Sequence, residues 1–330
     1  MKTVSAKKYD HLLKLSNDRQ VISALAIDQR TSLERMLDDA GLEGDLAPEI
    51  KKFKACVSEI LTSGASAILL DPQYGLAASQ VRADNAGLLL AYEVSGYDKN
   101  EAGRLPRFLP GVSVHRLAEA GADAVKFLLY YDCQEGAAIN DQKHAIIERL
   151  GAECEALGLP LFLEIVTYDA EIADKKSLAF AKKKPEKVLM AMKEFSKPQY
   201  GVDVLKIEVP VDMAYVTGYA QGEVAYSEQE ARDYFKAQDQ ATDLPYIYLS
   251  AGVSAELFQD TLRFAHEAGA RFNGVLCGRA TWRGAVEAYA DQGEAGAKKW
   301  LEAEGLANLA ALNEVLQGTA IPWSEKIKKA

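Results

Sequence analysis

The chain has 330 residues, 48% of them hydrophobic and 26% charged, and this composition excludes a disordered or fibrous protein. The formal net charge of −10 at pH 7 argues against a nucleic-acid-binding protein, which needs a basic surface, so an anionic ligand has to be held by local cations. A chain of this length fits one α/β barrel as well as it fits two smaller domains.

The sequence carries no signal for export, membrane insertion or metal binding. Its first residues, MKTVSAKKYDHLLKLSNDRQ, lack the apolar core of a signal peptide, and no run of about 18 uncharged apolar residues occurs. H-x-H, H-E-x-x-H and C-x-x-C are all absent, so the scattered cysteines are interpreted as small core residues. We therefore expect a cytoplasmic protein without a metal cofactor and without a membrane partner.

Eight short apolar runs rich in Val, Ile, Leu and Tyr follow one another, each separated from the next by enough residues for a helix. They begin at residues 21, 66, 88, 124, 160, 204, 246 and 274 and read VISALAID, SAILLD, LLLAYEV, AVKFLLYY, PLFLEIVTY, VLKIEVP, YIYLSAG and GVLCGRA. This alternation predicts an α/β protein with the (β/α)8 TIM-barrel fold. A doubly wound open sheet is the rival, but its G-x-G-x-x-G fingerprint follows neither Asp28 nor Asp71.

Helical segments fill the intervals between the runs. EIKKFKACVSEILTSG, HAIIERLGAECEALG and SAELFQDTLRFAHEAG each end at a glycine that can adopt the left-handed cap conformation. Ser227 and Glu230 form a capping-box pattern, and KKWLEAEGLANLAALNEVLQG predicts more helix after the eighth run. We predict a single domain over residues 1–330, with the barrel at about 20–290, additional N- and C-terminal helices, and a C-terminal helical extension at about 291–330.

Charged residues occur at positions of the predicted strands that should face the barrel interior. Alternate side chains of a strand point to opposite faces, so parity sorts each run into an inner and an outer set. The inner sets then contain Asp28, Lys126, Glu164, Lys206 and Glu208. A purely structural network of buried Lys–Glu pairs would stabilise the barrel less than apolar packing does, so we interpret these residues as functional.

These residue types suit the formation of an imine with a carbonyl substrate. A lysine amine has to be unprotonated to attack a ketone, and burial of Lys206 beside a second cation, Lys126, favours that form. Glu164 can move protons while the carbinolamine loses water. Asp28, at the strand end where barrel active sites lie, can orient or deprotonate a substrate hydroxyl. Together these groups can break a carbon–carbon bond next to a carbonyl.

The ends of the last two runs, LSAGVS and LCGRATW, are candidate phosphate-binding loops. Gly252 and Gly278 allow the backbone to approach a ligand closely, and Arg279 offers a bidentate cation. Ser254 is placed as a helix N-cap. Arg30, in DQRTS, either clamps a second phosphate or caps a loop.

Several of these segments together resemble the class I, metal-independent tagatose 1,6-bisphosphate aldolases. They are LAIDQRTSL, the FLLYY that follows Lys126, LFLEIVTY, DVLKIEVP and GVLCGRATW, and the likeness extends over nearly the whole chain. The resemblance implies a lyase that cleaves a phosphorylated ketose, tagatose 1,6-bisphosphate, to dihydroxyacetone phosphate and glyceraldehyde 3-phosphate in lactose and galactose breakdown. It also implies loose stereospecificity, with fructose 1,6-bisphosphate accepted.

The resemblance gives roles to individual residues. Lys206 would be the Schiff-base lysine and Glu164 the acid–base carboxylate, with Asp28 and Lys126 completing the catalytic set. Whether Glu164 or Asp28 takes the C4 hydroxyl proton stays open. The residues expected to bind the substrate and its phosphates are Gln29, Arg30, Ser250, Gly252, Gly278 and Arg279.

Three other functions are compatible with the same residues. One is a class I aldolase for another ketose phosphate, such as a sulfonated sugar phosphate, and a second is a transaldolase-like transferase that passes the fragment to another aldose. The third is a sugar-phosphate-sensing regulatory protein without turnover. Trp323 and amphipathic outer helices are compatible with a homodimer or a larger homo-oligomer.

Overall fold

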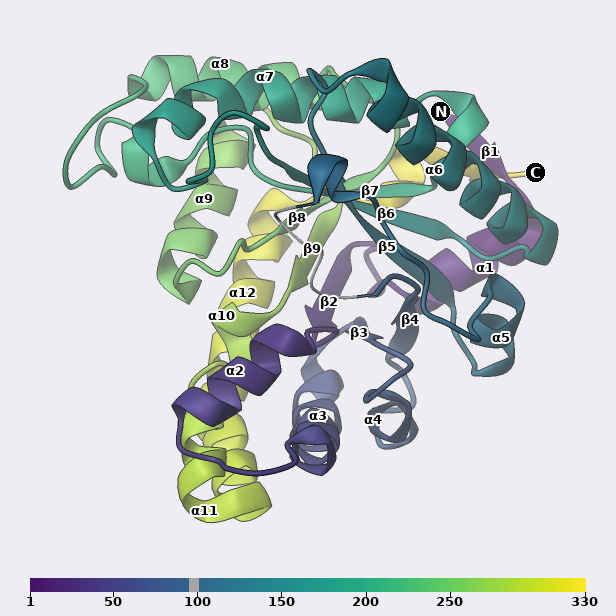
Figure 1. Ribbon diagram of the computed structural model, residues 1–330, viewed down its shortest axis with the longest axis vertical. Coiled ribbons are helices and arrows are strands. Elements are labelled where there is room, and N and C mark those ends of the chain that lie inside the picture. Colours follow the sequence, from purple (N-terminus) through teal and green to yellow (C-terminus); the bar gives the residue numbers. More distant parts are fainter. Residues whose placement is uncertain (95–100) are drawn as a thin grey trace.

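The computed structural model describes residues 1–94 and 101–330, and at its centre is a closed barrel of parallel strands with the order β2-β3-β4-β5-β6-β7-β8-β9 (Figure 1). The strands are β2 (Ile22–Ala26), β3 (Ala67–Leu70), β4 (Gly87–Ala91), β5 (Ala124–Tyr131), β6 (Leu161–Thr167), β7 (Val204–Ile207), β8 (Tyr246–Leu249) and β9 (Gly274–Cys277). Each strand lies in one of the eight predicted apolar runs, so the predicted TIM barrel is confirmed.

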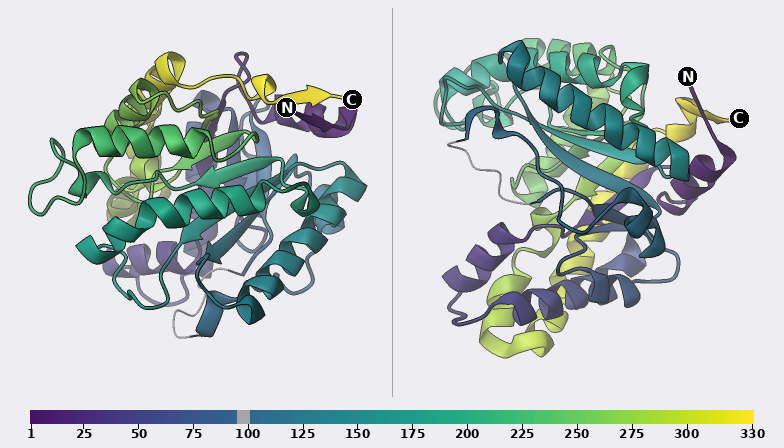
Figure 2. Two further views of the ribbon diagram at one scale, coloured as in Figure 1. Left: turned by 90° about the horizontal axis from the view of Figure 1, so that it is seen from above. Right: turned by 45° about the vertical axis from the view of Figure 1, so that its right-hand side comes forward.

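Helices surround the barrel and connect its strands (Figures 1 and 2). They are α2 (Thr31–Asp39), α3 (Ala47–Leu61), α4 (Leu76–Gln80), α5 (Val114–Glu119), α6 (Ala137–Leu157), α7 (Leu178–Phe195), α8 (Glu228–Asp239), α9 (Ala255–Glu267) and α10 (Arg279–Trp282). The predicted capping box is present, because the Ser227 side chain accepts from the Glu230 N–H while the Glu230 side chain accepts from the Ser227 N–H. No described helix combines the length and the apolar character that crossing a membrane requires.

The chain continues past the barrel as α11 (Ala285–Trp300), a π-helical turn (Leu301–Gly305) and α12 (Leu306–Thr319), which matches the predicted C-terminal helices. α12 packs beside α9, and α11 packs beside α3. These elements therefore belong to the helical layer on one side of the barrel, next to the β9-to-β2 junction where the barrel closes.

The two ends of the chain close the N-terminal end of the barrel. β1 (Lys2–Val4) pairs in parallel with β10 (Ile327–Lys329), and α1 (Ala6–Lys14) follows β1, so both termini lie on one side of the molecule (Figure 2). Leu12 and Trp323 are fully buried and belong to the same apolar cluster as the inward-facing residues of the strands. Because Trp323 packs inside this chain, it offers no surface to a second subunit.

The strands separate an inner from an outer core as their alternation predicts. Phe162 and Val204 belong to the cluster inside the barrel, whereas Leu163 and Leu205 belong to the cluster between strands and helices. The inner cluster consists mainly of small and aliphatic side chains, with Phe162 and Trp323 as large aromatic members. The inward charged residues lie within β5, β6 and β7 (Lys126, Glu164 and Lys206) and just after β2 and β4 (Asp28 and Glu93).

Glu208 departs from the predicted alternation. β7 ends at Ile207, and one residue later the Glu208 carboxylate accepts hydrogen bonds from the Thr167 N–H (2.7 Å) and hydroxyl (2.8 Å). Its side chain also lines a small space together with Val188 and Met192 of α7. The prediction that Glu208 faces the barrel interior is therefore wrong, because the strand stops before the alternation reaches it.

Candidate active site

Lys126 is the centre of a buried cluster of charges at the C-terminal end of the barrel. Its Nζ lies 2.8 Å from Asp28 Oδ2, 2.7 Å from Glu93 Oε1 and 2.7 Å from Glu164 Oε2. Asp28 and Glu93 follow β2 and β4, Glu164 lies in the middle of β6, and only 1% of the Lys126 side chain is exposed. Lys126 is thus a counter-ion for three carboxylates, and it reaches the predicted neighbour Lys206 through one of them, Glu164.

Glu164 connects Lys126 to Lys206. The same atom, Glu164 Oε2, lies 2.7 Å from Lys126 Nζ and 2.9 Å from Lys206 Nζ. The register of the barrel explains this contact, because Glu164 on β6 is the direct neighbour of Lys206 on β7 and both face inward. The four residues predicted to be catalytic are therefore linked through two bridging atoms, the Lys126 ammonium and one Glu164 oxygen.

The contacts fix the charges of the cluster. Burial opposes ionisation of Glu164 and Asp28, but the nearby Lys126 and Lys206 ammoniums lower the pKa of both carboxyls below their usual values. Burial also opposes the charge on Lys126, yet Asp28, Glu164 and Glu93 raise the pKa of Lys126 well above its usual value. At neutral pH the site consequently holds ionised carboxylates around a protonated Lys126.

The loops after β8 and β9 meet at the pair predicted to bind phosphate. Gly252 has a φ of +80°, and a Cβ at this position would lie 2.8 Å from Arg279 Nη2. A side chain at Gly252 would therefore push away the guanidinium that lies over it. Ser254 caps α9 as predicted, since its side chain accepts a hydrogen bond from the Leu257 N–H.

Ser250 and Gly278, which follow β8 and β9, lie near the charged cluster that contains Lys126 and Lys206. Ser250 is buried, and its side chain contacts the thiol of Cys277, which also feels the charge of Lys206. Burial raises the pKa of Cys277 to about 12, so the thiol stays protonated and is not a nucleophile at neutral pH. Gly278 lies against Gln29, whose Nε2 would be 3.5 Å from a Cβ at Gly278.

Arg30 connects the segment after β2 to the segment after β4. Its Nη2 donates to the backbone carbonyl of Glu93 at 2.7 Å, and its side chain is buried. Nε and Nη1 of Arg30 find no acceptor among the residues that the structure describes. All ten residues predicted for the site thus lie at one end of the barrel, and Arg30 keeps unused donors there.

Parity could also have identified Glu93. It follows β4 at the same parity as the inward-facing Leu89 and Ala91, so the signal that identified Asp28 was present in the third run as well.

The buried Lys54 could not have been identified in this way. It reaches from α3 to form a fully buried ion pair with Asp71 at the end of β3, and a single lysine in an amphipathic helix gives no signal for such a contact.

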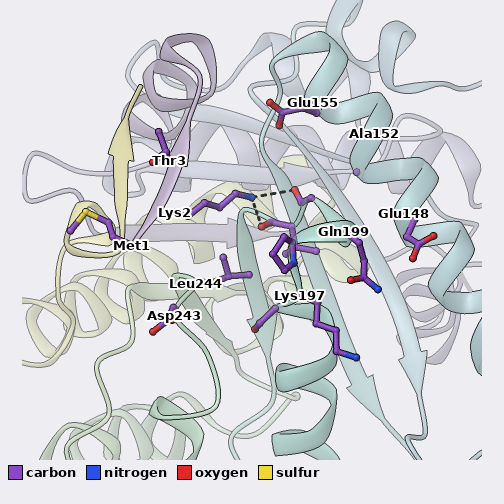
Figure 3. A pocket seen from close by; sticks show the side chains of 15 residues that line it. Met1, Lys2, Thr3, Glu148, Ala152, Glu155, Lys197, Gln199, Asp243 and Leu244 are labelled. Carbon is purple, nitrogen blue, oxygen red and sulfur yellow. Dashed lines mark hydrogen bonds between the residues drawn. The ribbon is translucent and has the colours of Figure 1, made fainter.

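A cavity of about 630 Å³ lies away from this cluster, at the N-terminal end of β7 and β8 (Figure 3). Lys2 points into it, and its Nζ donates to the Val202 carbonyl at 2.6 Å and lies 2.6 Å from Asp203 Oδ1. Asp203 also pairs with the buried Lys8 at 2.8 Å. Lys2, Glu155 and Lys197 in its wall are paired, and none of the ten predicted site residues lines it, so its size alone does not make it the reactive site.

The chain is similar in sequence to aldolases over almost its whole length. A family model described as DeoC/LacD family aldolase matches residues 22–284. Tagatose 1,6-diphosphate aldolase 2 of Streptococcus mutans is 56% identical over 324 residues, which are 98% of each chain. Tagatose 1,6-diphosphate aldolase of Staphylococcus aureus (strain Newman) is 57% identical over 322 residues, which are 98% of this chain and 99% of that one.

Solved structures show the same fold at low sequence identity. A fructose-bisphosphate aldolase of Plasmodium falciparum has a TM-score of 0.68 at 15% identity, covering 97% of both chains. A Schiff base forming fructose-1,6-bisphosphate aldolase has a TM-score of 0.59 at 17% identity, covering 93% of this chain and 98% of that one. The structural likeness establishes the barrel, and the extensive sequence similarity establishes the family: this chain belongs to the DeoC/LacD family of aldolases.

Proposed function

We propose that this protein is a class I aldolase that cleaves tagatose 1,6-bisphosphate to dihydroxyacetone phosphate and glyceraldehyde 3-phosphate through an imine on Lys206. The observation that carries the proposal is the single Glu164 oxygen held between Lys206 and Lys126 inside the barrel. An aldolase of this class needs an amine nucleophile beside a group that accepts and returns protons, and this pair supplies both. The similarity to tagatose 1,6-diphosphate aldolases points to the substrate.

Imine formation begins when the neutral amine of Lys206 attacks C2 of the open-chain ketose. Glu164 accepts the proton that the ammonium has to lose, because its Oε2 is the atom in contact with Lys206 Nζ. The protonated Glu164 then donates to the C2 hydroxyl of the carbinolamine, which leaves as water and creates the iminium. Donation of this proton leaves Glu164 ionised again, and the Lys126 ammonium stabilises the carboxylate.

Cleavage follows once the iminium withdraws electrons from C3. A carboxylate removes the proton of the C4 hydroxyl, the C3–C4 bond breaks, and its electron pair moves to the iminium nitrogen to give an enamine. Glyceraldehyde 3-phosphate leaves, a proton returns to C3, and water hydrolyses the resulting imine to release dihydroxyacetone phosphate. Since the iminium is the electron acceptor in this scheme, we propose that no metal ion takes part.

We assign the remaining predicted residues to binding the two phosphate groups of the substrate. The C1 phosphate lies next to C2, so we place it at the loops after β8 and β9, where the Ser250 hydroxyl, the open backbone at Gly252 and Gly278, and Arg279 are available. Gln29 lies beside Gly278 and completes this side. Arg30, with its unused donors, is the cation that we assign to the C6 phosphate.

We also propose that the enzyme acts on more than one ketohexose bisphosphate. Asp28 and Glu164 both contact the Lys126 ammonium, at 2.8 and 2.7 Å, so they lie close to each other at the place where C4 would bind. A C4 hydroxyl of either configuration then finds a carboxylate that can accept its proton. Relaxed stereospecificity, including cleavage of fructose 1,6-bisphosphate, would follow. We assign this activity to the cytoplasm, where phosphorylated sugars are metabolised.

Cleavage assays with added EDTA test the proposal. The wild-type protein should cleave tagatose 1,6-bisphosphate at the same rate with and without the chelator, and should also cleave fructose 1,6-bisphosphate. Lys206→Ala should remove both activities while its unfolding transition stays cooperative. A wild-type protein that needs a divalent metal, or that acts only when an acceptor aldose is present, would require a different reaction class.

A further inference from the structure

Glu93 is a buried carboxylate of which one oxygen has a partner and the other has none in the described part of the chain. It follows β4, only 2% of it is exposed, and its Oε1 lies 2.7 Å from Lys126 Nζ. Its Oε2 is also buried but has no hydrogen-bond partner within the described part of the chain. A buried carboxylate oxygen without a donor is costly, and groups of this kind in a folded protein call for an explanation.

Other unmatched polar atoms lie near Glu93. Arg30 donates one bond to the Glu93 backbone carbonyl but leaves Nε and Nη1 without acceptors, and Gln29 Oε1 lacks a donor, as far as residues 1–94 and 101–330 show. The wall formed by the ends of β2 and β4 therefore contains buried donors on Arg30 and a buried acceptor on Glu93 that have no partner in the described part of the chain. A polyhydroxylated phosphate ester offers the complementary set, because its hydroxyls donate while its phosphate oxygens accept.

The barrel order places the β4 part of this wall opposite the phosphate loop of β8. β4 and β8 are four strands apart in a closed order of eight strands, so Glu93 and Ser250 follow strands on opposite sides of the barrel. A ketose joined to Lys206 at C2, with its C1 phosphate at Ser250, has to extend its distal carbons toward β2 and β4. Among carbons C4 to C6, the C4 hydroxyl gives up its proton in the cleavage step. The C5 hydroxyl is therefore the one left to donate a hydrogen bond to a further residue.

We propose that Glu93 is a further substrate-contacting residue, whose Oε2 accepts a hydrogen bond from the C5 hydroxyl of the bound ketose bisphosphate. The proposal rests on the proposed aldolase function and deepens it, because it names a group that recognises the half of the substrate released as the aldehyde. Oε2 has no exposure in the free protein, so neighbouring side chains have to move to admit the sugar. The contact would then make the substrate satisfy an acceptor that the folded chain leaves unsatisfied.

Glu93→Gln probes the unoccupied oxygen selectively. The amide oxygen can still accept from Lys126, whereas the amide nitrogen cannot, so the variant is expected to present its NH2 group in the position of Oε2. An acceptor is thereby replaced by a donor while the side-chain shape stays the same. Lys126 also keeps its contacts with Asp28 and Glu164, so the rest of the cluster retains its counter-ion.

The experiment compares two substrates and two steps of the reaction. For tagatose 1,6-bisphosphate, Glu93→Gln should lower kcat/KM by about tenfold or more, in line with the loss of a charge-assisted hydrogen bond. The 5-deoxy analogue should be cleaved about tenfold more slowly than tagatose 1,6-bisphosphate by the wild type, and this difference should nearly vanish in Glu93→Gln. Dihydroxyacetone phosphate, which lacks C4 to C6, should form the borohydride-trapped imine equally well in both proteins.

Glu208→Gln is the matched control, because Glu208 is also a buried carboxylate just after a strand, but its contacts are with Thr167 and Lys175 outside the barrel interior. It should leave the discrimination against the 5-deoxy analogue unchanged.

If Glu93→Gln does not fold, the comparison of the two substrates on the wild type still decides, since equal kcat/KM values would overturn the proposal. An equal loss of imine formation and cleavage in Glu93→Gln would also overturn it, because Glu93 would then act only through Lys126. Failure of the aldolase function itself would show separately, as absent cleavage by the wild type.

Discussion

Glu164 Oε2 touches two ammonium groups at once, Lys126 Nζ at 2.7 Å and Lys206 Nζ at 2.9 Å. In the proposed mechanism one lysine keeps the carboxylate ionised while the other exchanges a proton with it. This relationship explains why a barrel interior contains two lysines on neighbouring strands. Lys126 is held by three carboxylates and stays charged, whereas Lys206 shares its carboxylate with Lys126 and is the amine that we propose as the nucleophile.

Replacing Glu164 with Gln tests its assignment as the proton carrier. The amide keeps a similar shape but cannot take the proton from Lys206 or return it to the carbinolamine. Imine formation with dihydroxyacetone phosphate should slow by a factor of about 100 to 10,000. A stopped-flow or quenched borohydride time course measures this rate. A rate within about threefold of the wild type would show that another group carries the proton.

The phosphate assignment makes a prediction about Gly252. Gly252→Ala places a Cβ 2.8 Å from Arg279 Nη2 at a φ of +80°, so the guanidinium has to move and the KM for tagatose 1,6-bisphosphate should rise about tenfold or more. Gly218→Ala is the matched control, because Gly218 has a φ of +92° but nothing within 4 Å of its Cβ position. The control carries similar backbone strain, and its KM should stay at the wild-type value. Equal KM values for the two variants would contradict the assignment of Arg279 to phosphate binding.

Removing Lys126 should destabilise the fold in a pH-dependent way. In the wild type, Lys126 lowers the pKa of Asp28 and of Glu164, so its stabilising effect is present above their unfolded values of about 4 and is lost as the pH falls. The raised pKa of Lys126 itself adds stability that is lost only as the pH rises above about 10.

Lys126→Met leaves Asp28 and Glu93 without their cation and Glu164 with Lys206 alone, which should reduce the free energy of unfolding at pH 7 by about 3 to 5 kcal/mol. The deficit should shrink at pH 5, because the carboxyls of the variant take up protons more readily than those of the wild type. Urea unfolding of both proteins at the two pH values measures the difference. A deficit of the same size at both pH values would mean that lost packing, and not charge, causes it.

The closure of the N-terminal end of the barrel can be tested at Trp323. This side chain is fully buried, packs edge-on against Tyr9 with the ring centroids 5.0 Å apart, and donates to the Ser16 hydroxyl at 3.0 Å. Trp323→Ala should therefore lower the free energy of unfolding by about 3 to 5 kcal/mol. Because the reacting groups lie at the opposite end, kcat measured well below the unfolding temperature should be unchanged. A loss of less than about 1 kcal/mol would show that the C-terminal segment does not seal the barrel.

The barrel and its inward charges could be predicted because both depend on local periodicity. Each strand is a short apolar run, and two-residue alternation inside β5, β6 and β7 assigns Lys126, Glu164 and Lys206 to the interior without any knowledge of the neighbouring strands. The same rule failed for Glu208, because a strand end cannot be located to within one residue from periodicity alone. Glu93 obeys the rule at the end of the third run.

Contacts between distant segments could not be predicted in this way. The pairing of β1 with β10 joins Lys2 to Ile327 through strands of only three residues, and such short segments at the two ends of a chain have no periodicity to reveal a partner. The burial of Lys54 depends on Asp71, which belongs to a different element. The hydrogen bond from Arg30 to the Glu93 carbonyl likewise depends on loop conformation, and so do the unmatched polar atoms of Arg30 and Gln29.

The central claim is that Lys206 is the residue that binds the substrate covalently. Incubation with dihydroxyacetone phosphate and borohydride, followed by peptide mass spectrometry, identifies the modified lysine directly. The account predicts one reduced three-carbon adduct, located on Lys206 and absent from Lys206→Ala. An adduct on Lys126 or another lysine, or undiminished cleavage by Lys206→Ala, would contradict it.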